Sequence, residues 1–185
     1  NKKIDLEKKI TLNNKIYIDN LIDTKHSDNI INILIRNTYR PNYFKKCIDS
    51  ILQQTIDKTH IRIYICYDDK RCLEYLNQYI HYDNIEIFSV ENIEKNQRYF
   101  YNLFCNELLD KVNNGWILFI DDDNLFSSEK SLQLIYNKIL LSNDNNIIIW
   151  KVKINDNIII FPENISSLKK GEIDTNGICF NSKNK

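Results

Sequence analysis

The sequence has little of the residues that interrupt or link structural elements. Its 185 residues include three glycines, two prolines and no methionine. No stretch rich in glycine, serine or proline divides the chain, and its length and 43% hydrophobic content suit one core better than two. We therefore expect a single domain. Because an initiator methionine is missing, we expect either a processed chain or a soluble domain cut from a larger protein.

Long apolar runs and net charge are absent as well. No run approaches the roughly 20 residues of a membrane span, and the charged start, NKKIDLEKKI, is unlike a signal peptide. The 25 basic residues balance 25 acidic ones, so no overall field favours nucleic acid or an anionic membrane. These absences predict no transmembrane segment and no nucleic-acid partner.

Paired cysteine motifs are also missing. The five cysteines are an odd number and include no C-x-x-C pair. This pattern favours reduced thiols over a disulfide or zinc framework. We expect five unpaired thiols, with Cys66 and Cys105 the most buried, and a reducing compartment, the cytoplasm, as the location.

Strand and helix patterns alternate from residue 31 onward. Four short apolar runs predict strands, at residues 31–36, 61–67, 84–90 and 116–120. The amphipathic runs after them predict helices, at residues 43–54, 70–80, 96–112 and 128–141. This alternation predicts an α/β fold, with a mostly parallel Rossmann-like central sheet and helices on both faces.

The two ends of the chain depart from this alternation. Residues 1–30 predict an N-terminal extension, with a peripheral strand at KIYIDNLID. Near the C-terminus, IIIWKVKINDNIIIF contains two β-rich runs about an Asn-Asp-Asn turn, which predicts a β-hairpin.

Three consecutive aspartates, Asp121 to Asp123, follow directly on the apolar strand WILFI. Ligands of parallel sheets bind beyond the carboxyl ends of the strands. Alternation along the chain places Asp121 and Asp123 on one side and Asp122 on the other. Two converging carboxylates suit Mg²⁺ or Mn²⁺, which also recruits phosphate oxygens. The alternative is a solvated acidic turn ahead of the next helix.

Two other strand ends carry polar residues. Asp68 and Asp69, after the second strand, suit a turn and helix cap, or else recognition of a base or ribose; taken separately, the cap is favoured. In RNTYRP, after the first strand, Thr38 and Tyr39 suit a nucleotide, and Arg36 or Arg40 suits phosphate. The alternative for the arginines is a solvated surface charge.

Taken in order, three motifs amount to a resemblance. INILIRNTYRPNYFKKCIDSILQQT, IRIYICYDDK and GWILFIDDDN together resemble a GT-A-fold nucleotide-sugar glycosyltransferase and are similar to the family-two group, over about residues 31–141. The resemblance implies a catalytic domain at 31–185, with a nucleotide-sugar part at 31–126 and an acceptor part at 127–185.

The resemblance also implies roles for individual residues. The residues implied to contact the nucleotide-sugar are Thr38, Tyr39, Arg40, Asp68, Asp69, Arg98, Asn102, Asp121 and Asp122. Asp121 and Asp123 are implied to hold the metal through the DxD motif. The chain departs from the family where KRCLEY replaces a Gly/Ser-rich continuation, and in having no histidine after the sheet. In GEIDTNGICF, Asp174 is the candidate catalytic base on the acceptor side; a turn leading into an edge strand explains it equally well.

We therefore expect a metal-dependent hexosyl- or pentosyltransferase. It would use a nucleoside diphosphate sugar, with UDP as first guess from the resemblance, and an unknown glycan, protein or small-molecule acceptor. Two alternatives remain. A nucleotidyltransferase would normally have a Gly-rich phosphate loop, whereas RNTYRP contains no glycine. A non-catalytic nucleotide-binding or receiver-like module would share the acidic strand ends.

Overall fold

The structure is a computed structural model that describes residues 29–90, 101–154, 158–162, 169 and 171–185. The strand expected within residues 1–28 lies outside the described residues. The strands are β1 (Ile31–Asn37), β2 (Ile61–Tyr67), β3 (Ile85–Ser89), β4 (Trp116–Asp121), β5 (Ile147–Ile149), β6 (Val152–Ile154), β7 (Ile158–Ile160) and β8 (Ile178–Asn181). The α-helices are α2 (Pro41–Leu52), α3 (Leu73–Leu76), α4 (Tyr101–Lys111) and α5 (Ser131–Ile139).

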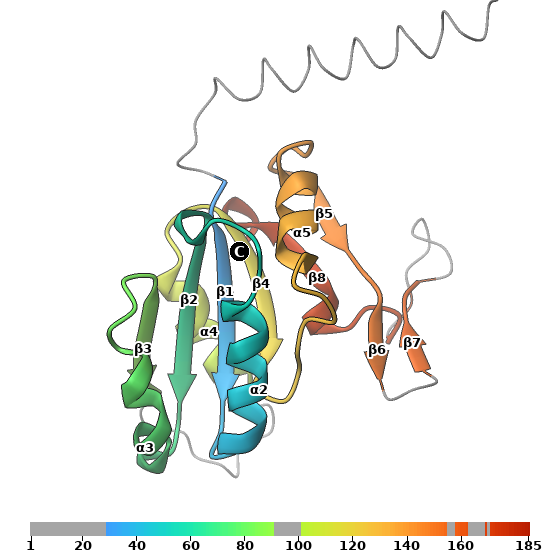
Figure 1. Cartoon of the computed structure of the whole chain (residues 1–185). Coiled ribbons are helices and arrows are strands. Elements are labelled where there is room, and N and C mark those ends of the chain that lie inside the picture. Colours follow the sequence, from blue (N-terminus) through green and yellow to red (C-terminus); the bar gives the residue numbers. More distant parts are fainter. Residues whose placement is uncertain (1–28, 91–100, 155–157, 163–168, 170) are drawn as a thin grey trace, which may run out of the picture.

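A six-stranded sheet forms the centre of the molecule, in the order β3-β2-β1-β4-β8-β5 (Figure 1). The pairs β1–β2, β2–β3 and β1–β4 are parallel, whereas β8 pairs antiparallel with both β4 and β5. The mostly parallel α/β sheet is therefore confirmed. β2 and then β3 extend the sheet from one edge of β1, whereas β4 pairs with the other edge of β1. This change of direction between β1 and β4 is the place where open α/β sheets bind ligands.

The central strands β1 and β4 are buried on both faces because helices cover both. Along β4, Trp116, Leu118 and Ile120 pack into one cluster, while Ile117 and Phe119 pack into the other. The first cluster includes α2 and α5, and the second includes α4. Each fully buried Ile, Leu or Phe side chain contributes roughly 1.5–3 kcal/mol. Because successive strand side chains point to opposite faces of the sheet, alternate residues of β4 belong to opposite clusters.

The C-terminal hairpin is present, but it is shorter than the sequence predicts. β6 and β7 form a separate antiparallel pair, with Val152 opposite Ile160. The residues before it, Ile147 to Ile149, leave the hairpin and join the main sheet through β8. The chain bends at Trp150, whose N–H donates to the carbonyl of Gly177 at 3.0 Å. One predicted β-run is thus divided between two sheets.

The helix predicted at residues 70–80 was also wrong in detail. It consists of two 3₁₀ turns, η3 (Lys70–Cys72) and η4 (Asn77–Tyr79), on either side of the four-residue α3. All five cysteines are free; Cys66 is buried as expected, but Cys105 is only half-buried. Within the part of the chain that the structure describes, no helix is both long and apolar enough to cross a membrane.

Candidate functional site

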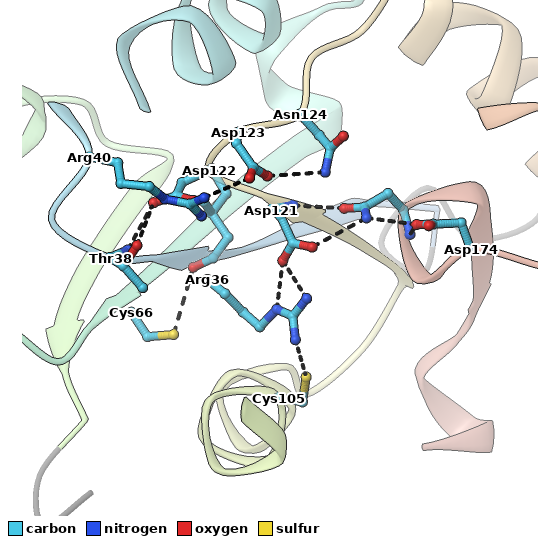
Figure 2. A network of polar contacts seen from close by, with 12 residues as sticks. Arg36, Thr38, Arg40, Cys66, Cys105, Asp121, Asp122, Asp123, Asn124 and Asp174 are labelled. Atoms are coloured by element: carbon cyan, nitrogen blue, oxygen red, sulfur yellow. Dashed lines mark hydrogen bonds and ion pairs between the residues drawn. The ribbon is translucent and has the colours of Figure 1, made fainter. Parts of the chain in front are cut away.

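The carboxyl ends of β1 and β4 meet at a small cavity. In the β1–β4 register Arg36 lies opposite Asp121, so the loops that follow the two strands start side by side. The cavity has a volume of about 300 Å³ and is lined by Arg36, Thr38, Arg40, Phe104, Asp121 and Asp123. Asp121 and Asp123 thus share one side of the acidic run, as alternation predicts, and Asp122 lies on the other. Figure 2 shows the polar contacts around it.

A larger hollow, of about 640 Å³, lies at the opposite edge of the sheet, where β2 and β3 begin. Its charged lining residues, Lys58, Arg62, Asp83 and Glu86, are of both signs. Parallel sheets bind ligands at their carboxyl edge, so the smaller cavity is the candidate site.

Asp122 is held inside the protein. Its side chain is 0% exposed; the Thr38 backbone N–H donates to its Oδ2 at 2.8 Å, and the Arg40 guanidinium pairs with its Oδ1. Burial raises the pKa of Asp122 above its ordinary value, while Thr38 and Arg40 act in the opposite direction. A carboxylate enclosed in this way fixes the β1 loop against the β4 turn and is not open to a ligand.

Asp123 lies on the turn after β4 and is 40% exposed. Its Oδ2 accepts from Arg40 Nη1 at 2.6 Å, and its Oδ1 accepts from Asn124 Nδ2 at 3.4 Å. Arg40 therefore spans Asp122 and Asp123 with its two terminal nitrogens (Figure 2). The third donor of the same guanidinium, Nε, is buried and has no hydrogen-bond partner among the residues that the structure describes.

Asp121 has partners on both carboxylate oxygens. Arg36 Nε donates to Oδ1 at 2.7 Å, and Asn176 Nδ2 donates to Oδ2 at 3.3 Å. The Asp121 N–H also donates to Asn176 Oδ1 at 2.7 Å. On its far side, Arg36 Nη1 lies 3.9 Å from Cys105 Sγ, so this half-buried thiol lies beside the Arg36–Asp121 pair.

Asp174 is linked to the acidic run through the same asparagine. The 3₁₀ turn η6 (Thr175–Gly177) begins after Asp174, whose Oδ1 accepts from the Asn176 backbone N–H at 2.8 Å and from Asn176 Nδ2 at 2.7 Å. The segment before β8 therefore returns to the carboxyl edge of β4. Sequence reasoning included Asp174 but missed Asn176. The only signal was the DTNG turn itself.

Other residues expected at the site lie apart from this network. Asp69 is the N-cap of η3: its Oδ1 accepts from the Arg71 N–H at 2.9 Å, and its carboxylate pairs with the Arg71 side chain. The Arg71 guanidinium carbon lies 4.3 Å from the centroid of the Tyr39 ring. The Tyr39 hydroxyl donates to Glu74 Oε2 at 3.3 Å. These residues pack over α3 and do not line the cavity.

The other residues that the sequence suggested for the site occupy different positions in the structure. Asp68 is half-buried between β2 and η3, and Asn102 is exposed on the first turn of α4. Arg98 lies outside the described residues. Arg36 and Arg40, considered as phosphate ligands or solvated charges, instead pair with the aspartates.

The donor set fits a metal ion that a substrate helps to hold. The described residues contain no group of three or more His, Cys, Asp or Glu side chains arranged around a metal. The cavity does offer carboxylates, and Asp123 is the accessible one. Mg²⁺ is commonly held by one or two carboxylates plus substrate phosphates, and Mn²⁺ accepts the same oxygen ligands. Asp121 fits less well, because both of its oxygens already have partners.

Comparisons with solved structures agree with this architecture. The structure of S. aureus TarS residues 1–349 matches with a TM-score of 0.64 and 14% identity, over 83% of this chain and 47% of that one. Its complex with UDP matches with a TM-score of 0.61. The mannosyltransferase PcManGT from Pyrobaculum calidifontis, in complex with GDP-Man and Mn²⁺, matches with a TM-score of 0.51 and 10% identity, over 69% of this chain and 39% of that one. This chain thus spans less than half the length of these structures.

At these identities the structural likeness shows the GT-A-like fold. No curated protein matches the chain. A family model described as glycosyl transferase family 2 matches residues 31–182, which are most of the chain. The protein therefore belongs to glycosyl transferase family 2.

Proposed function

We propose that this protein transfers a sugar from a nucleoside diphosphate sugar to an acceptor hydroxyl, with the help of a divalent metal. The observation that carries the proposal is the placement of an acidic run and two arginines around one cavity between β1 and β4. The family match over residues 31–182 supports it, as do the neighbours whose structures contain UDP-GlcNAc, UDP, or GDP-Man with Mn²⁺. A cytoplasmic location is proposed from the five free thiols.

Each part of the cavity has a role in this proposal. Asp123 would hold Mn²⁺ or Mg²⁺, with Asp121 as the next nearest carboxylate of the cavity. A bound metal would offset the charge that develops on the departing diphosphate. Arg36 and Arg40 supply positive charge at the same edge. The nucleoside would lie toward Thr38 and Tyr39, on the β2 side, where Asp68 and Asp69 also lie.

Asp174 is the proposed general base. A base for an inverting transfer must approach the acceptor hydroxyl within about 3 Å. Among the described residues, the Asp174 side chain accepts hydrogen bonds at Oδ1 alone, from Asn176, which leaves Oδ2 to meet an acceptor. Asp174→Asn should lower turnover at least ~10²-fold while keeping nucleotide affinity within about twofold. Weakened nucleotide binding with turnover retained would make Asp174 a donor-site residue instead.

The proposal is tested by a thermal-shift screen of UDP, GDP, dTDP and CDP, each with Mn²⁺ or EDTA. A ligand with a micromolar Kd at millimolar concentration stabilises the native state by roughly 4 kcal/mol. One nucleotide should give a clear shift with Mn²⁺ and little in EDTA, because the diphosphate and carboxylates otherwise repel each other. Asp123→Asn should lose the metal-dependent part of the shift. Equal UDP or GDP affinity in EDTA, for wild type and variant, would refute the metal role.

A further inference from the structure

Arg40 occupies the carboxylate that would bind the divalent metal in the proposed function. Its guanidinium spans Asp122 and Asp123, and Asp123 is the accessible carboxylate of the cavity. A divalent ion on Asp123 would have to share that carboxylate with Arg40 Nη1, 2.6 Å away. Two cations on one carboxylate repel each other, so metal binding and the Arg40–Asp123 pair oppose each other.

We propose that Arg40 exchanges partners when the donor binds: Nη1 leaves Asp123 to the metal and takes a diphosphate oxygen. This inference rests on the proposed function and concerns the same site. It assigns Arg40 as the residue that couples metal binding to nucleotide binding. In the free protein Arg40 offsets one of the two charges of Asp122 and Asp123. The metal and the diphosphate are then expected to bind together more tightly than either does alone.

The burial of the two aspartates determines which contact is exchanged. Asp122 is 0% exposed, and losing Arg40 would leave its charge buried with neutral donors such as those of Thr38. Asp123 is 40% exposed and can be solvated or can bind a metal when Arg40 departs. The pair with Asp122 therefore stays, as a pivot, and the pair with Asp123 is the one that opens.

The unpartnered Nε of Arg40 points to the same movement. A buried N–H without an acceptor is unfavourable, and native structures contain few. Nε lies on the same edge of the guanidinium as Nη2, the atom that stays on Asp122. When Nη1 leaves Asp123 and the guanidinium turns about the Asp122 pair, the surroundings of Nε change as well. Arginine N–H groups form strong hydrogen bonds to phosphate oxygens, so Nη1 and Nε would each gain an acceptor from the diphosphate or its solvation shell.

The first measurement needs no variant and uses the wild-type protein. Mn²⁺ binding is followed by electron paramagnetic resonance, which counts free Mn²⁺, with and without saturating UDP and, separately, GDP. The Mn²⁺ Kd should fall at least ~10-fold with the nucleotide that binds, a coupling within the usual range for linked sites. Because free nucleotide also binds Mn²⁺, the same titration is run without protein and subtracted.

The second measurement uses Arg40→Gln and a matched control. Lys45 also pairs with an aspartate at 2.6 Å, Asp49 on the exposed side of α2, and does not line the cavity. Lys45→Gln therefore makes the same charge change elsewhere. Arg40→Gln should bind Mn²⁺ without nucleotide at least ~5-fold more tightly than wild type. UDP or GDP should tighten it less than in wild type, because only the phosphate–metal contacts then couple the two ligands. The Lys45→Gln protein should match wild type in both.

The outcomes separate this inference from the proposed function. Nucleotide binding in the thermal screen, with a Mn²⁺ Kd that no nucleotide changes, overturns the exchange and, because coupling is reciprocal, the metal role as well, and it leaves a metal-independent transferase standing. Equal or weaker Mn²⁺ binding by folded Arg40→Gln, compared with wild type, also overturns it. The absence of any nucleotide binding overturns both. If Arg40→Gln fails to fold, the wild-type coupling decides, and Arg40→Lys, which keeps the charge, should retain part of the coupling.

Discussion

Two acidic runs follow β2 and β4, which both pair with β1, and the ion pairs described for them span different distances along the chain. Asp69, after β2, pairs with Arg71, two residues further along the chain. Asp122 and Asp123, after β4, pair with Arg40, more than 80 residues away in sequence. A local pair forms wherever its own turn forms. A distant pair forms only when β1 and β4 lie side by side, so the acidic run after β4 depends on the whole sheet.

The comparison also separates stability from function. The Asp69–Arg71 pair belongs to the cap of η3 and has an exposed arginine, so local structure explains this pair. The charges after β4 sit at the change of chain direction, where loop residues from separate strands converge on a ligand. Acidic strand ends that look alike in sequence thus differ in what they can bind.

The largest expected effect is at Asp122. Asp122→Ala should lower the free energy of unfolding by about 3 kcal/mol, because Arg40 and the Thr38 N–H lose a buried partner. This value is the low end of the usual range, since Arg40 is 40% exposed and can reach water. Urea denaturation measures it. Asp122→Asn should cost less, and an alanine variant as stable as wild type would show that the distant pair adds nothing.

An intermediate effect is expected at Asn176, which joins the β8 segment to the acidic run. Asn176→Ala removes its side-chain bonds to Asp121 and Asp174 and should cost about 2 kcal/mol, as several partly buried bonds to charged groups are lost. The control is Asn124→Ala, whose amide makes a 3.4 Å contact to Asp123. In chemical denaturation, Asn176→Ala should lose at least about 1 kcal/mol more free energy of unfolding than Asn124→Ala does. Equal losses would show that Asn176 does not hold the β8 segment to the acidic run.

The smallest effect is expected at Asp69. Asp69→Ala removes the N-cap of η3 and should cost about 1 kcal/mol. Asp69→Ser, which keeps a capping oxygen but not the charge, should recover most of that loss. Thermal unfolding of the two variants checks this. A loss as large as that of Asp122→Ala would mean that the local and distant pairs do not differ in the way the structure indicates.

The sequence predicted the strands well because each is a short apolar run with a polar end. β1, β2 and β4 agree with the expected ranges to within one residue. It also predicted that Asp121 and Asp123 share one side, since alternation along a strand is a local property. The helix at residues 70–80 was predicted less well, since the structure divides it into η3, α3 and η4.

The partners of the acidic run could not be predicted from spacing. Arg36 and Asp121 are 85 residues apart, and only the pairing of β1 with β4 brings them together. Asn176 was missed for a similar reason: its turn reaches Asp121 because β8 runs antiparallel beside β4. A four-residue strand gives no sequence signal for its neighbour or its direction.

The position of β8 has a consequence for synthesis and folding. β4 carries the apolar run Trp116 to Ile120, and β8 supplies hydrogen bonds along the side of β4 that β1 does not cover. While residues 178–181 are still being synthesised, the open edge of β4 would be a template for pairing with another chain. We therefore expect nascent or truncated chains that lack β8 to need chaperones more than the full chain does, with Trp116 to Leu118, the residues that pair with β8, as the segment at risk of aggregation.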